Sequence, residues 1–184
     1  MVEGGYLNLF VSSRDHPDLE SLASLQQLGS LFAGIPDAGR LFQRLEETYI
    51  DLFVNSNPRL VAPLYHSCYV GEEHSSGGSL MGEPALEMAD RFNEVGLISR
   101  EDISEPPDHL AFELEYLSFL LEQAINLNHT PMLSVASGFA RDFMVPWVTM
   151  FCLKLNTVEE DSFYKYIADI LIYILNRVTT LSSP

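Results

Sequence analysis

Residues 104–124 read SEPPDHLAFELEYLSFLLEQA, and this stretch decides the fold class because it joins a marked helix start to a long apolar stripe. Pro107 suits the first position of a helix, where a missing backbone N–H costs nothing, and Pro106 keeps the preceding chain extended. From Asp108 to Leu127 apolar residues recur every three or four positions, which predicts an amphipathic helix. The stripe consists of Leu110, Leu114, Leu117, Leu121, Ala124 and Ile125, widened by Tyr116, Leu120 and Leu127.

Two ionisable residues lie near the start of this helix, on or beside its apolar side. Glu113 falls inside the apolar arc, and His109 precedes it by four residues on the same side, so the two side chains can meet. An isolated buried carboxylate is costly, and we therefore expect His109 to pair with Glu113. A purely structural interpretation is open as well, in which Asp108 caps the helix and the prolines fix its entry angle. That interpretation explains each residue separately but not their combination.

The same helical spacing recurs along most of the chain and predicts an all-α protein, a single compact helical bundle. Residues 55–82 are rich in Pro, Gly and Ser and are expected to form a loop, and residues 98–107 a linker. Pro146 is expected to kink its helix. The predicted helices span residues 15–36, with Asp15 as the N-cap, 37–55, 83–97, with Pro84 in the first turn and Gly96 at the stop, 108–127, 132–155 and 158–178.

The composition limits the kinds of partner. The chain has 26 acidic and 10 basic residues, a formal net charge of −16. Such a surface repels nucleic-acid phosphates and anionic lipids and attracts a basic peptide, although acidity also serves solubility alone. No apolar run approaches the roughly 20 residues that span a bilayer, and MVEGGYLNLFVSS at the start has no basic segment before its apolar residues. Two cysteines, Cys68 and Cys152, make no disulfide framework, so we expect a cytoplasmic protein.

Four segments together resemble one known family. EPPDHLAFELEYLSFL resembles the Glu-x-Pro-x-Asp-His-x-x-x-Glu signature of the TorD/DmsD family of molybdoenzyme-maturation chaperones, which is related to the NarJ group. PLYHSCY, residues 63–69, is similar to the proline-aromatic-x-Ser-x-aromatic segment of that family, and LMGEPALEMADRFNEVGL to the helix that follows it. FARDFMVPWVTMF is similar to its tryptophan-containing helix. Here the chain departs from the family, because Phe143 stands four residues before Trp147, where members often carry a histidine.

The resemblance implies a chaperone, not an enzyme, with one all-helical domain over residues 1–184 and a hinge at 99–107. It implies that the protein binds, in the cytoplasm, the twin-arginine leader and the apo form of a molybdopterin oxidoreductase subunit, assists cofactor insertion and delays export. A monomer or a domain-swapped dimer is expected, without a cofactor of its own. By matching position, the leader-binding residues are Tyr65, Tyr69, Leu80, Glu105, Pro107, Asp108 and His109, and the hinge or structural residues are Pro106, Glu113 and Trp147.

The residues fit this expectation, since binding a leader with a basic front and an apolar middle calls for acidic side chains beside an apolar groove. Rival functions have weaker support. His109 and Glu113 could form an acid–base pair, but no nucleophile motif accompanies them. The segment HSSGGSLMG, residues 74–82, lacks the ending of a phosphate loop, and His66, Cys68 and His74 match no standard metal spacing. A helical adaptor for a different protein partner stays open as the alternative.

Overall fold

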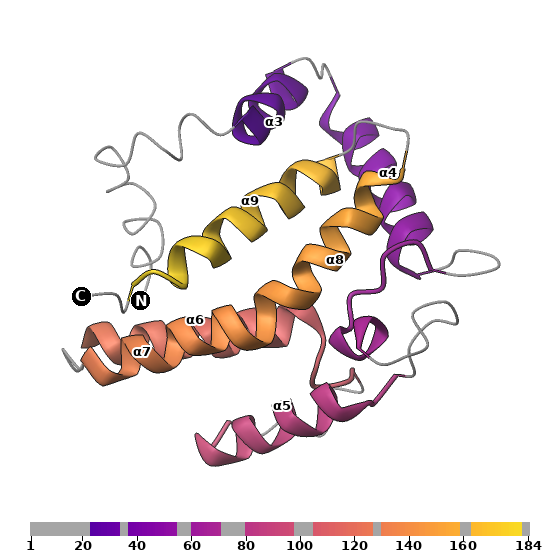
Figure 1. Ribbon diagram of the computed structural model, residues 1–184. Helices are drawn as coiled ribbons and strands as arrows, with labels where there is room; N and C mark the ends of the chain where they lie inside the picture. Colours follow the sequence, from indigo (N-terminus) through magenta and orange to yellow (C-terminus); the bar gives the residue numbers. More distant parts are fainter. Residues whose placement is uncertain are drawn as a thin grey trace.

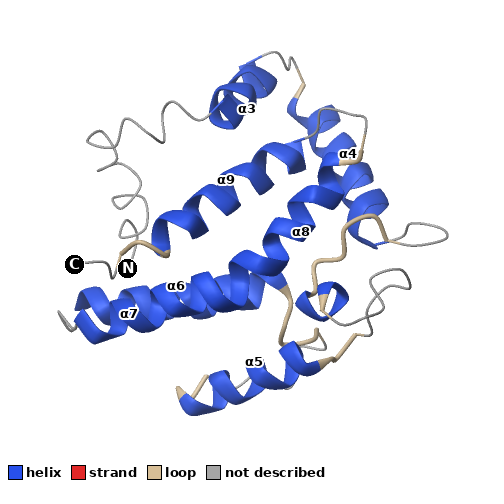
Figure 2. Cartoon of the chain, in the orientation of Figure 1, coloured by secondary structure: helices blue, strands red, loops and turns tan. Residues whose placement is uncertain are grey.

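The computed structural model describes residues 23–33, 37–54, 60–70, 80–97, 105–126, 130–158 and 163–181. Over these ranges the chain is helical and contains no strand, which confirms the predicted all-α class (Figures 1 and 2). The helices are α3 (Ala23–Ala33), α4 (Ala38–Tyr49), α5 (Glu83–Glu94), α6 (Leu110–Asn126), α7 (Thr130–Gly138), α8 (Val145–Asn156) and α9 (Phe163–Val178), with a 3-10 turn at His66–Tyr69.

Single residues with known backbone or capping preferences mark the ends of α4 and α5. Asp37 caps α4, its carboxylate accepting hydrogen bonds from the N–H groups of Gly39 and Arg40, as expected of an N-cap. Pro84 lies in the first turn of α5, and Gly96 adopts a positive φ of 71° just beyond its end. The predicted helix at residues 15–36 is present from Ala23 to Ala33, and its proposed cap lies outside the described residues.

The helix predicted over residues 132–155 is divided by a π-helical turn, Phe139–Met144, between α7 and α8. Pro146 follows in the first turn of α8, where its missing N–H cannot continue the ladder of the preceding turn. The wider π turn accommodates that break, and α7 and α8 run in different directions (Figure 1). The expected kink is therefore real, and it places Phe139, Phe143 and Trp147 on the inner side of the molecule.

The core gathers around α8. This helix packs against α9, the π turn and the 3-10 turn, while α6 lies beside α7 and α3 packs against α9 (Figure 1). Met88 of α5, Met144, Trp147 and Leu175 are almost fully buried. Because α8 touches the segment that contains His66–Tyr69, the core reaches directly to the corner where α6 begins.

Candidate functional site

The start of α6 is joined to a segment far away in sequence. The backbone of residues 64–66 pairs with that of 108–110 in an isolated antiparallel bridge between Tyr65 and His109. The N–H of His66 donates to the carbonyl oxygen of Asp108 at 3.0 Å, and the N–H of Leu110 donates to that of Leu64 at 2.8 Å. The segments matched to the family signature and to its aromatic motif therefore form one corner.

Asp108 is buried in this corner with no exposed surface. Its Oδ2 accepts two hydrogen bonds from Ser67, one from the backbone N–H at 2.7 Å and one from the hydroxyl at 2.5 Å. The Ser67 hydroxyl oxygen in turn accepts a bond from the N–H of Gly82 at 3.0 Å. Oδ1 of Asp108 is buried and has no hydrogen-bond partner within the described ranges. Both hydrogen bonds from Ser67 to Asp108 therefore link it to the 3-10 turn, and neither caps α6.

His109, not Asp108, meets the backbone at the helix start. Its Nδ1 accepts a hydrogen bond from the N–H of Ala111 at 3.1 Å, and its half-buried ring lies edge-on to Tyr65, with centroids 5.1 Å apart. Burial lowers the pKa of His109, while Glu105 and Asp108 oppose the change. His109 therefore caps the start of α6, and this is not the role that its spacing from Glu113 predicted.

The expected pairing of His109 with Glu113 is wrong. Glu113 lies inside the apolar face as expected and is buried fully, not partly, but its Oε1 lies 3.1 Å from Nδ1 of His66 and its Oε2 accepts a 2.8 Å hydrogen bond from Nε1 of Trp147. The His66 ring stacks on Trp147 at 5.3 Å and lies edge-on to Phe143 at 4.7 Å. Burial raises the pKa of Glu113, and the bonds from His66 and Trp147 oppose the rise. We call Glu113, His66 and Trp147 the buried clasp.

The outer side of the corner carries an exposed carboxylate. Glu105 accepts a 2.7 Å hydrogen bond from the hydroxyl of Tyr65, whose ring is partly buried between Glu105 and His109. Burial, and then the bond to Glu105, raise the pKa of Tyr65. Pro106 and Pro107 are half-buried and lead from Glu105 into the corner. A polar group that reaches the corner from solvent therefore meets Glu105 before any other acid of the signature.

The two remaining predicted site residues occupy different environments. Tyr69 is only 7% exposed, and its hydroxyl donates to the carbonyl oxygen of Pro63 at 2.8 Å while its ring lies 5.5 Å from Trp147. It supports the corner from inside. Leu80 is 53% exposed and lies in the turn before α5. The expected site is therefore divided between an inner set that fixes geometry and an outer set that solvent reaches.

His66 and Ser67 are the residues that sequence reasoning missed as partners of the two acids. The available signal was the aromatic segment 63–69, which contains both, but nothing in local spacing shows that it meets α6. Within the described ranges no group of three His, Cys, Asp or Glu side chains could hold a metal ion, and His74 lies outside those ranges. No helix of the described residues is long and apolar enough to cross a membrane.

Comparison with known proteins assigns this architecture to one family. The family model described as nitrate reductase delta subunit matches residues 13–153, so the chain belongs to that family. It is 27% identical over 135 residues to the chaperone protein TorD of Vibrio atlanticus and 28% identical over 132 residues to TorD of Photobacterium profundum. These matches cover 70% of this chain and only 59% of each relative's length.

A solved structure agrees with the family assignment. A protein from Archaeoglobus fulgidus, described as a candidate redox enzyme maturation protein, superposes with a TM-score of 0.51 at 30% sequence identity. The match covers 73% of this chain and 67% of that one. The all-helical fold and the resemblance seen in the signature segments are thereby confirmed.

Proposed function

We propose that this protein is a maturation chaperone for a molybdopterin-dependent oxidoreductase, and that it acts in the cytoplasm by binding the subunit's twin-arginine leader and apo form. Holding the apoprotein assists cofactor insertion and delays export. Family membership and the TorD chaperones among the relatives support the class of function. In this proposal the protein is a binding protein and catalyses no reaction.

The observation that carries the proposal is the state of Asp108. A carboxylate that served only to start a helix would accept hydrogen bonds from the N–H groups of its first turn, as Asp37 does in α4, and a buried oxygen without a donor is destabilising. Asp108 instead has one oxygen satisfied by Ser67 and one that meets no hydrogen-bond donor among the described residues, in a fully buried position. A guanidinium group supplies the donors that this oxygen lacks.

The corner offers a route for such a group. Glu105 is exposed and meets an approaching arginine first, in exchange for its bond from the Tyr65 hydroxyl. Release of Tyr65 would free the ring that lies against His109, the residue next to Asp108. Two acids at successive depths match two adjacent arginines, and the net charge of −16 attracts a cationic leader at low ionic strength.

The test begins by identifying the client through affinity capture from the native host and mass spectrometry. The leader of the recovered oxidoreductase precursor is then fused to a soluble carrier protein, and its affinity is measured by calorimetry. Asp108→Asn keeps an oxygen for the Ser67 bonds and removes the charge, so we expect the fold to persist while affinity falls about 10- to 100-fold. Glu105→Gln should weaken binding in the same direction.

Glu115→Gln is the matched control, since it removes the same charge from an exposed position of α6 two residues beyond Glu113. It should bind the leader like the wild type. If folded Asp108→Asn and Asp108→Ala variants both retain full leader affinity, the proposal is wrong. Recovery of only mature or unrelated proteins, while such an oxidoreductase is expressed, would favour the helical adaptor and leave the corner a structural helix start.

A further inference from the structure

The turn that precedes α5 holds its backbone in an unfavourable conformation. Met81 has a φ of 65° and is the one non-glycine residue with positive φ among those described. The left-handed region is costly for a long side chain, and glycine or asparagine usually takes such a position. A persistent strain of this kind needs a compensating reason, and such outliers cluster at binding sites.

Burial of the side chain is not that reason. With Gly82 as the N-cap of α5, Met81 occupies the position before the cap and Leu86 the fourth helical position, a pair that ordinarily packs together to shield apolar surface. Here Met81 is 56% exposed and Leu86 is 63% exposed, and neighbouring Leu80 is 53% exposed. The strained turn therefore presents apolar side chains to solvent instead of covering them.

Two hydrogen bonds through Ser67 link this turn to the Asp108 corner. The N–H of Gly82 donates to the Ser67 hydroxyl oxygen at 3.0 Å, and that hydroxyl donates to Asp108 at 2.5 Å. A Cβ at residue 82 would lie 3.2 Å from Cβ and Oγ of Ser67, so a larger residue there would push against the side chain that holds Asp108. The exposed apolar group is therefore held in a fixed position relative to the buried acid.

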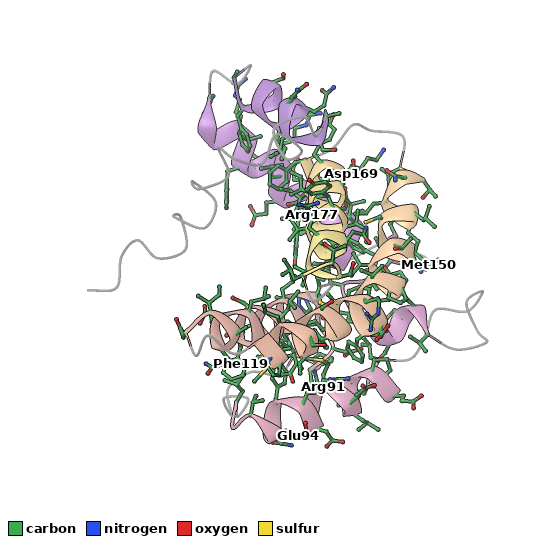
Figure 3. The ribbon with its side chains drawn as sticks, turned by 60° about the vertical axis from the view of Figure 1, so that its left-hand side comes forward. Arg91, Glu94, Phe119, Met150, Asp169 and Arg177 are labelled. Atoms are coloured by element: carbon green, nitrogen blue, oxygen red, sulfur yellow. The ribbon has the colours of Figure 1, made fainter. Side chains whose placement is uncertain are left out.

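Charge surrounds the same apolar group. Glu83 and Asp90 lie three residues before and four residues after Leu86, which makes them its neighbours on the helix surface, and both are exposed. Glu87 is paired with Arg91, which points from α5 toward the neighbouring helices (Figure 3). The Arg91 guanidinium lies over the rings of Phe139 and Phe143 on the inner side of α5. The outer side of α5 is thus apolar at its start and acidic along its length, which complements a segment that is apolar and flanked by basic residues.

We propose that Leu80, Met81 and Leu86 form an apolar docking tip for the uncharged middle of the client's leader, and that Met81 is strained in order to present it. This inference rests on the proposed function, since the bound segment is the same leader whose arginines go to Glu105 and Asp108. The tip explains the strain, the exposure and the bond from Gly82 to Ser67 together. Methionine suits the role, because its flexible side chain adapts to apolar residues of different shape.

The test separates stability from binding. Met81→Asn accepts the left-handed backbone and removes the apolar side chain, so we expect the melting temperature to rise by about 2–4 °C while affinity for the carrier-fused leader falls about five- to tenfold. Leu86→Ser should weaken binding by a similar factor without the gain in melting temperature. Ile125→Ser is the matched control: it is 58% exposed but lies near the far end of α6, about 22 Å along the helix from the corner.

A second leader, with serines in place of its apolar middle and both arginines kept, completes the design. Wild type and Met81→Asn should bind this leader equally, because the contact that distinguishes them is gone. If Met81→Asn and Leu86→Ser bind the natural leader as tightly as the wild type, while binding still depends on the arginines, the docking tip is refuted and the proposed function stands. If the wild type binds neither leader, both proposals fail.

Discussion

Replacement of His66 by alanine tests the buried clasp, because this histidine is the partner that Glu113 has in the structure. The substitution leaves Oε1 of the fully buried Glu113 without its 3.1 Å contact and removes a ring that stacks on Trp147 and meets Phe143. His109→Ala is the matched comparison. It removes an imidazole of the same size, four residues from Glu113, that makes one hydrogen bond to a helix start.

The two variants should differ clearly in stability. Removing one member of a buried charged or hydrogen-bonded pair costs about 3–5 kcal/mol, since the other member stays desolvated. Loss of a helix cap costs about 1 kcal/mol. For a chain of this size, each kcal/mol changes the melting temperature by roughly 2–4 °C, so His66→Ala should melt at least about 6 °C lower and His109→Ala about 2–4 °C lower.

Denaturant unfolding at pH 7, followed by far-ultraviolet circular dichroism, gives the free energies of unfolding. The comparison holds when the variants share the same slope of free energy against denaturant concentration. If the clasp is as described, His66→Ala loses at least twice the free energy of unfolding that His109→Ala loses. Equal losses, or a greater loss for His109→Ala, would show that Glu113 is stabilised by its i−4 neighbour in solution, and the clasp as described would be wrong.

Two further predictions concern pH and backbone conformation. Because burial raises the folded-state pKa of Glu113 above its ordinary 4.5, the folded state binds a proton more readily than the unfolded chain, so this group favours folding increasingly as pH falls through its folded pKa toward 4.5. Unfolding measured across that window should show the wild type gaining stability relative to Glu113→Gln on acidification, and a constant or shrinking difference would contradict the assignment. Gly96→Ala should lower the free energy of unfolding by about 1 kcal/mol, because φ at this position is 71°. No described atom lies within 4 Å of a Cβ placed there, so the loss comes from backbone strain alone. Gly96→Asn should lose less stability, and thermal melting of the two variants measures the difference.

Local chemistry allowed much of the fold to be predicted. Asp37 marks a helix end through its side-chain carboxylate, Pro84 and Gly96 through their backbone preferences, and these ends are where the sequence indicated. The burial of Glu113 also followed from helical periodicity. The partner of Glu113 did not, because His66 is 47 residues away and only the packed chain brings it near, whereas the nearer His109 is engaged by Ala111.

The π turn shows the same division between local and long-range information. Pro146 predicted a break in the helix, and the break is present. Proline chemistry does not specify whether the chain bends sharply or widens into a π turn, because aromatic packing decides between them. The rings of Phe139 and Phe143 stack with their centroids 5.1 Å apart, and the Arg91 guanidinium of α5 lies over both. The wider turn points these two rings toward the inside of the molecule.

The buried clasp explains why this corner contains a polar pair where apolar side chains would also fill the space. An apolar pair in place of His66 and Glu113 would fill the same space without desolvating a carboxylate, and such replacements are often more stable. Apolar contacts, however, tolerate sliding, whereas Glu113 is satisfied only when His66 and Trp147 both meet its two oxygens. That requirement fixes one register of residues 63–69 against α6. The bonds of Ser67 follow from this register, and they hold Asp108 and Gly82, and with them the proposed acidic and apolar contacts of the leader, in one arrangement.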